Sequence, residues 1–197
     1  MSARAAYQAL DRALERLEGF IVTVGLVLSV GSTLVEVILR NSSTILTAVG
    51  MRQSSSLGGG GEFAQMTMIW AALIGAAMGM RAGIHIGVDV LVQRLPARGT
   101  KAMLLLGIAV GMAFTASVMV LGWRLVAFSH DSGQVTAELF FPRWLLYLSV
   151  PVSMALMTLH QAQVFVELWR RPATQVKRAA QAEVAAMADA EAEAARA

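Results

Sequence analysis

Four long runs of apolar residues set the strongest limit on how this chain can fold. They cover residues 20–39, 63–80, 102–128 and 144–169. A helix of about 20 residues, at ~1.5 Å per residue, matches a bilayer hydrocarbon core of about 30 Å. Only 15% of the residues are charged and the mean hydropathy is +0.61, as expected for a membrane protein. The sequence therefore predicts an all-α membrane protein with four transmembrane helices.

The basic residues are distributed unequally around these runs. One side of the predicted bundle has Arg40, Arg52, Arg124 and Arg143. The other side has Arg4, Arg12, Arg16, Arg81, Arg94, Arg98, Lys101, Arg170, Arg171, Lys177, Arg178 and Arg196. Because Lys and Arg concentrate in short cytoplasmic loops, we predict that both termini lie in the cytoplasm. The net charge of +3 then reflects topology and contact with anionic membrane lipids, and no nucleic-acid partner is indicated.

Composition divides the chain into a membrane domain and two flanking segments. Residues 1–18 place Tyr7, Leu10, Leu14 and Leu17 at helical spacing, which predicts an amphipathic helix on the cytoplasmic surface. The alternative is a plain extension of the first span. Residues 19–171 form the four-span domain, in which the Ser- and Gly-rich stretch 41–61 predicts a flexible external loop. Residues 172–197 predict an Ala-rich, helical cytoplasmic tail.

Small residues recur in the second span and continue beyond it. They stand four residues apart and form one ridge: Ala71, Gly75, Gly79, Gly83 and Gly87. Such a ridge lets a neighbouring helix approach closely, either within the bundle or from a partner subunit. The simpler explanation is that glycine and alanine are common in membrane helices. Both explanations remain open on the sequence alone.

A polar stripe follows the same span. Arg81, His85 and Asp89 are four residues apart, so they share one face if the helix continues past Met80. One imidazole and one carboxylate supply only two of the usual four zinc ligands, which argues against a metal site. We expect either a solvated surface stripe or a contact with a partner subunit.

The sequence indicates neither an enzyme nor a cofactor. It contains no cysteine, no nucleophile–His–acid grouping, no phosphate-binding loop and no pair of carboxylates within the spans. One alternative is a redox subunit in which His85 and His160 bind a haem. Another is a stand-alone four-helix carrier, although the interrupted helices and midplane polar ligands of such carriers are lacking.

Two stretches carry a resemblance to a known family. The first contains Glu62, Trp70, the step Gly75-Ala76-Ala77, the pattern Arg81-x-x-x-His85-Ile86-x-Val88-Asp89, and Leu95-Pro96. The second contains Phe141-Pro142-Arg143-Trp144, Tyr147 and Pro151. With four spans and both ends inside, residues 17–171 resemble the small membrane subunit of tripartite ATP-independent periplasmic (TRAP) transporters, the DctQ-like family. The Ser- and Gly-rich segment 54–61 and the Ala-rich tail depart from the family pattern.

The resemblance implies a place in a three-part transporter of the bacterial inner membrane. A periplasmic substrate-binding protein captures an organic anion, and a large multi-span subunit carries it inward with sodium by an elevator movement. The small subunit widens the fixed scaffold of the large one. In this role Gly75, Gly79 and Gly83 support close helix packing, and Arg81, His85 and Asp89 fix the cytoplasmic end of the second helix. Glu62, Trp70, Pro142, Trp144 and Pro151 are then structural positions.

Overall fold

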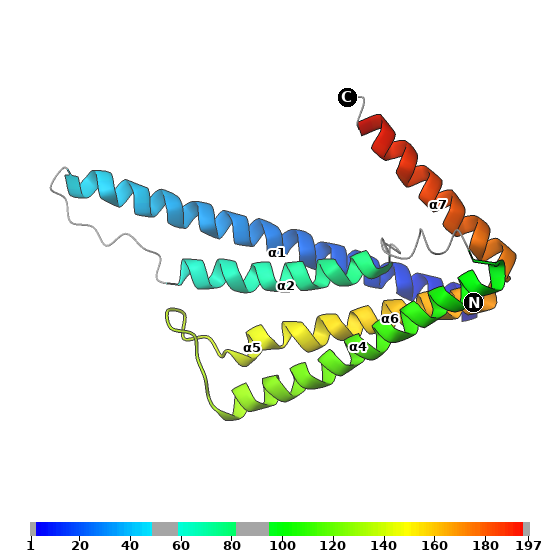
Figure 1. The fold of residues 1–197 in the computed structure, drawn as a ribbon. Helices are drawn as coiled ribbons and strands as arrows, with labels where there is room; N and C mark the ends of the chain where they lie inside the picture. Colours follow the sequence, from blue (N-terminus) through cyan, green and yellow to red (C-terminus); the bar gives the residue numbers. More distant parts are fainter. Residues whose placement is uncertain (1–2, 49–58, 82–94, 195–197) are drawn as a thin grey trace. The chain divides into compact units, whose positions relative to one another are not determined.

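The computed structural model describes residues 3–48, 59–81 and 95–194, and it is helical almost throughout these ranges (Figure 1). The helices are α1 (Ala3–Ala48), α2 (Gly60–Arg81), α4 (Ala97–Asp131), α5 (Trp144–Tyr147), α6 (Ser149–Arg170) and α7 (Ala173–Ala194). Two compact units are distinguished. One comprises Met1–Met78 with Val118–Leu156, and the other comprises Gly79–Ser117 with Met157–Ala197.

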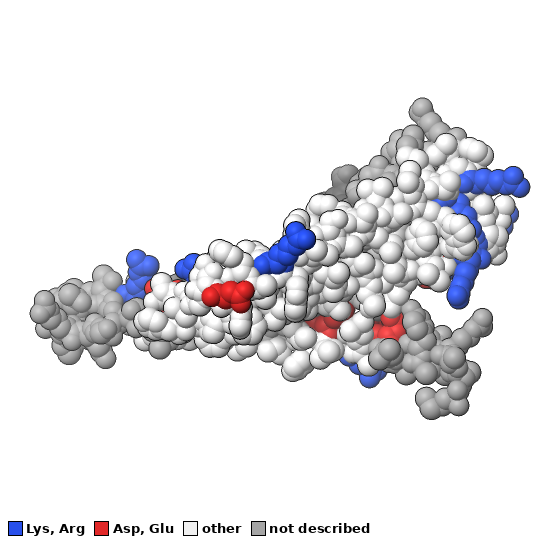
Figure 2. Space-filling model, turned by 90° about the horizontal axis from the view of Figure 1, so that it is seen from below, with Lys and Arg blue, Asp and Glu red and all other residues white. Residues whose placement is uncertain are grey.

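Four stretches of helix in the described part are long and apolar enough to cross a membrane. They are Asp11–Ser42, Gly60–Met80, Ala97–Asp131 and Trp144–Arg170. Large apolar side chains such as Phe20, Val27 and Phe114 are exposed along them. The face drawn in Figure 2 is correspondingly poor in acidic and basic side chains over most of its area. The prediction of an all-α integral membrane protein with four spans is confirmed.

The helices extend beyond the apolar runs that predicted them. The first begins at Ala3 and continues without a break to Ala48. Residues 3–18 therefore continue the first span as helix, and their amphipathic, cytoplasmic character stays a prediction. Residues 41–48 belong to this helix and not to a flexible loop, whereas residues 49–58 lie outside the described part. The Ala-rich tail forms α7.

Small and hydroxylated residues hold α1 and α2 together as an antiparallel pair (Figure 1). Ser29 Oγ donates a hydrogen bond to the Ala64 carbonyl at 2.9 Å, and Ser32 Oγ donates one to the Gly60 carbonyl at 3.0 Å. Farther along, a Cβ placed on Gly25 would lie 3.0 Å from Ala71 Cβ. The two backbones approach this closely because Gly25 has no side chain.

One helical hydrogen bond is missing where α5 meets α6. Proline has no N–H, so Pro151 cannot donate the helical hydrogen bond to the carbonyl of Tyr147. The last residue of α5 is Tyr147, and α6 starts at Ser149. Pro151 itself is buried, and its Cδ would be 3.1 Å from a Cβ placed on Gly122 of α4. Leu148 keeps helical backbone angles (φ −61°, ψ −25°), so Pro151 removes one hydrogen bond from the last span without breaking it.

Lysine side chains satisfy backbone carbonyls where α6 ends. The Nζ of Lys101 donates to the carbonyls of Trp169 and Arg171, both at 2.8 Å. Lys177 Nζ donates to the carbonyl of Leu95 at 2.9 Å. Terminal carbonyls of a helix have no partner within it, and a cation there also favours the helix dipole. The Lys101 contacts fix the start of α4 against the end of α6, and the Lys177 contact ties α7 to the residues that precede α4.

Candidate functional site

Glu62 in the first turn of α2 binds a stretch of backbone that lies far along the chain. Its carboxylate accepts hydrogen bonds from three consecutive N–H groups, those of Ala137 at 2.9 Å, Glu138 at 3.1 Å and Leu139 at 3.0 Å. These residues belong to the loop between α4 and α5. Charge-assisted hydrogen bonds are stronger than neutral ones. One acidic side chain therefore joins the start of α2 to this loop.

A second carboxylate returns the contact from the loop to α2. The Glu138 Oε2 atom accepts a hydrogen bond from the backbone N–H of Gly59 at 2.9 Å. Gly59 immediately precedes α2, where the N–H groups lack intrahelical partners and the helix dipole favours negative charge. We call the contacts of Glu62 and Glu138 with these backbone groups the carboxylate junction.

The loop at the junction has a defined internal geometry. Its two arms meet in an isolated antiparallel bridge between Val135 and Pro142. The N–H of Thr136 donates to the Phe141 carbonyl at 2.8 Å, and the N–H of Phe141 donates to Thr136 Oγ1 at 3.0 Å. Phe140 at the turn has φ +52°, a conformation that costs a non-glycine residue free energy. The bridge and the two carboxylates over-determine this turn and keep it in place.

Any other residue at Gly59 is disfavoured at the junction for two separate reasons. Its φ is +93°, and a Cβ placed on it would lie 2.4 Å from Leu139 Cδ2. Gly133 shares a positive φ of +60°, but no heavy atom lies within 4 Å of its Cβ position among the described residues. It therefore isolates the conformational cost from the steric one.

We expect Gly59→Ala to lower the free energy of unfolding more than Gly133→Ala does. The Gly133 variant should cost only the left-handed backbone penalty, about 1–2 kcal/mol. The Gly59 variant adds displacement of Leu139, which disturbs an N–H that Glu62 binds. Unfolding of the detergent-solubilised protein by increasing SDS measures both. Equal losses would show that the junction tolerates movement of Leu139.

An apolar groove of about 480 Å³ opens beside the junction, in the same compact unit. Trp70 of α2 lies in its wall, together with Phe20 and Leu28 of α1 and with Leu139 and Phe141 of the loop. The groove contains almost no polar surface, because the hydroxyl of Thr67 donates to carbonyls of its own helix. Trp70 thus contributes to an apolar surface next to the junction.

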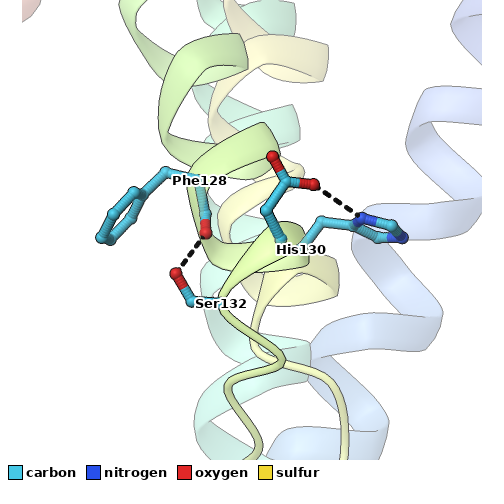
Figure 3. Close-up of polar contacts among 4 residues, drawn as sticks. Phe128, His130 and Ser132 are labelled. Atoms are coloured by element: carbon cyan, nitrogen blue, oxygen red, sulfur yellow. Dashed lines mark hydrogen bonds and ion pairs between the residues drawn. The ribbon is translucent and has the colours of Figure 1, made fainter.

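The end of α4 that leads into this loop is closed by its own polar side chains (Figure 3). Ser132 Oγ donates to the Phe128 carbonyl at 2.6 Å, and His130 Nδ1 lies 3.5 Å from Asp131 Oδ1. The His130 ring meets the edge of Trp144, with ring centres 5.8 Å apart. Pro142 accepts a hydrogen bond from Leu145 N at 3.2 Å and so precedes the first turn of α5. Pro142 and Trp144 thus both lie where the loop leads into α5.

The members of the small-residue ridge have different surroundings in the structure. A Cβ on Gly75 would lie 3.8 Å from the Val22 methyl groups, so Gly75 packs against α1. No heavy atom of the described residues lies within 4 Å of the Cβ position on Gly79. Arg81 is the last residue of α2. Gly83, His85 and Asp89 fall outside the described residues, as does the Arg81 side chain, so the polar stripe remains a prediction.

The residues behind the haem alternative are not brought together by the described part of the structure. His160 is completely buried in α6, and His85 falls outside the described residues. No group of three or more His, Cys, Asp or Glu side chains suited to a metal ion occurs in the ranges that were searched. Because His85 is one of its two ligands, the haem alternative stays a prediction.

Comparison with known proteins agrees with the resemblance seen in the sequence. The family model described as the DctQ component of tripartite ATP-independent periplasmic transporters matches residues 29–171. A small permease protein of a C4-dicarboxylate TRAP transporter from Rhodobacter capsulatus is 37% identical over 103 residues, which are 52% of this chain and 45% of the relative. A protein of the same description from Vibrio cholerae serotype O1 is 29% identical over 119 residues, or 48% of this chain and 50% of the relative. The chain thus matches about half the length of these curated relatives.

Proposed function

Because the chain belongs to the DctQ component family of tripartite ATP-independent periplasmic transporters, we propose that it is a scaffold subunit, which supports a larger multi-span subunit in the membrane. The carboxylate junction is the observation that carries this proposal. Glu62 is an acidic residue at the edge of a membrane span, where a transporter could use it to bind an ion or substrate. Here three backbone N–H groups occupy its oxygens. Its role is to fasten the start of α2 to the loop between α4 and α5.

The family to which the chain belongs implies the remaining parts of the transporter. The large subunit moves an organic anion, such as a carboxylate, inward with sodium, and a periplasmic binding protein delivers the anion. The names of the two relatives specify C4-dicarboxylates, which makes four-carbon dicarboxylates the first substrates to test. The chain lies in the bacterial inner membrane with both termini in the cytoplasm, in keeping with its basic residues. The carboxylate junction then lies on the periplasmic side.

Identification of the partner tests the proposal most directly. The chain would be tagged at its C-terminus, extracted from its native membrane in mild detergent, and analysed for co-purifying proteins. Near-equal amounts of one large multi-span protein support the scaffold. Uptake of a radiolabelled four-carbon dicarboxylate by proteoliposomes should then require both polypeptides, the binding protein and a sodium gradient. A chain that purifies alone, absorbs visible light or transports by itself would contradict the proposal.

Gly79 gives a prediction about the partner surface. Since Gly79 belongs to the small-residue ridge of α2 and its Cβ position is open among the described residues, we propose that a helix of the large subunit packs there. Gly79→Leu should reduce recovery of the large subunit roughly fivefold or more, because overpacking a close helix contact is destabilising. Gly107→Leu on α4 is the matched control, since its Cβ position is also open. Equal recovery with the two variants would place the partner elsewhere. The role of Arg81, His85 and Asp89 at the cytoplasmic end of this helix stays a proposal.

A further inference from the structure

Arg124 lies at a defined depth along α4. Residues 102–123, between Lys101 and Arg124, contain no charged side chain. At ~1.5 Å per residue this stretch is about 33 Å long, which matches a hydrocarbon core of about 30 Å. The two cations therefore delimit the membrane-embedded part of α4. Arg124 stands at the level of the lipid headgroups, two turns before the end of α4.

The Arg124 side chain has no protein anion to bind in the described structure. It is exposed, and it makes no hydrogen bond or ion pair with another described residue. The adjoining helix segments 118–130 and 144–156 contain neither Asp nor Glu. Asp131 lies two turns farther along α4 and is 3.5 Å from His130. A cation at this depth attracts a counter-charge, and the surrounding headgroups provide phosphate groups.

An apolar groove begins directly at Arg124. It measures about 580 Å³ and lies within one compact unit. Besides Arg124 its walls are formed by Met119, Val120, Trp123, Pro151, Val152 and Ala155. The walls are close at one point, where Gly122 meets Pro151 and Val150. The small side chain of Ala155 leaves space farther along, so the groove is built by the helix contact itself.

Trp123 adds the third component of this surface. Its side chain is 61% exposed and stands next to Arg124 in the sequence. Tryptophan is enriched at the boundary between headgroups and hydrocarbon, where its ring is apolar and its N–H can donate a hydrogen bond. The groove thus combines an interfacial ring and a guanidinium with an apolar channel. The guanidinium suits the phosphate of a phospholipid, and the channel suits its acyl chain.

We propose that this groove binds one phospholipid. The Arg124 guanidinium binds the phosphodiester, for which its paired N–H groups are suited, and one acyl chain lies between residues 119–123 of α4 and residues 151–155 of α6. Binding is independent of the transported substrate and of the scaffold role. The alternative occupant, an acidic side chain on a helix of a partner protein, is distinguished by the experiment below.

Native mass spectrometry of the full chain, purified with its partners in mild detergent, tests the site. The probes are dioleoyl phosphatidylglycerol and dioleoylglycerol, which differ by the phosphate-containing headgroup. We expect phosphatidylglycerol to remain bound to the wild type and dioleoylglycerol to dissociate. Arg124→Gln should weaken phosphatidylglycerol binding about tenfold or more, as loss of a charge-assisted hydrogen bond does. Ala155→Leu, which fills the groove without changing charge, should weaken it as well.

Arg143→Gln is the matched control, because Arg143 is an exposed arginine near the same helix ends that does not contribute to the groove. It should leave lipid binding unchanged. Equal loss in the Arg124 and Arg143 variants would show general attraction of anionic lipid and would overturn the proposal. Unchanged lipid binding in Arg124→Gln, together with loss of a co-purifying polypeptide, would also overturn it and would assign the guanidinium to a partner carboxylate.

Discussion

Glu62→Ala should release the loop between α4 and α5 from the start of α2. The substitution removes the acceptor of three consecutive backbone N–H groups at residues 137–139. No other side chain of α2 replaces it, so these groups should exchange with solvent about tenfold faster or more. Hydrogen–deuterium exchange of peptides covering residues 134–142 measures this directly. We expect the purified complex to lose stability in detergent at the same time.

Three comparisons separate the junction from a general effect of lost charge. Glu62→Gln keeps one carbonyl acceptor and should give an intermediate exchange rate. Glu138→Gln affects only the bond to Gly59 N and should have a smaller effect than Glu62→Ala. Asp131→Ala removes an exposed acid near the same loop, which contacts His130 and none of residues 137–139, and it should leave exchange at those residues unchanged. Unchanged exchange in Glu62→Ala would refute the junction.

Gly25→Leu should separate α1 from α2 and lower stability strongly. Even a Cβ at this position would lie 3.0 Å from Ala71 Cβ and 3.2 Å from the Thr67 carbonyl oxygen. The remaining leucine atoms have no space, so the helices must move apart and strain the hydrogen bond from Ser29 to Ala64. Overpacking of this kind costs about 1–3 kcal/mol. The midpoint of unfolding in SDS should fall accordingly.

Gly31→Leu is the control on the same helix. No heavy atom of the described residues lies within 4 Å of the Gly31 Cβ position, and leucine is a better helix former than glycine. This variant should be as stable as the wild type or more so. A similar loss in both variants would mean that glycine is needed in α1 for a reason other than its contact with Ala71.

The number and nature of the spans could be predicted from the sequence, whereas their ends could not. Hydropathy detects the residues that suit hydrocarbon, and a helix can continue where it is solvated. The stretch 41–48 is polar at its start and predicts a loop, yet it forms the end of α1. The missing hydrogen bond between α5 and α6, by contrast, has a local cause, because Pro151 has no N–H.

The functional site was predictable in one residue and hidden in its partners. Glu62 stood out through its place in the family pattern. Its partners are the backbone N–H groups of residues 137–139, about 75 positions away in the sequence, and a backbone donor is present at every non-proline residue. Glu138 is an acid in a short loop, and no spacing connects it with Gly59. Only the tertiary structure shows that the two carboxylates serve one junction.

The long sequence separation of the carboxylate junction has a consequence for biogenesis. During synthesis α1 and α2 emerge first and can pair, whereas residues 137–139, whose N–H groups Glu62 binds, have not yet been synthesised. They reach Glu62 only if α4 crosses the bilayer and delivers the loop to the side on which α2 begins. A molecule whose α4 has failed to cross leaves both Glu62 and Glu138 without these bonds. The junction therefore stabilises only the correct topology, and a mis-inserted chain lacks this stabilisation.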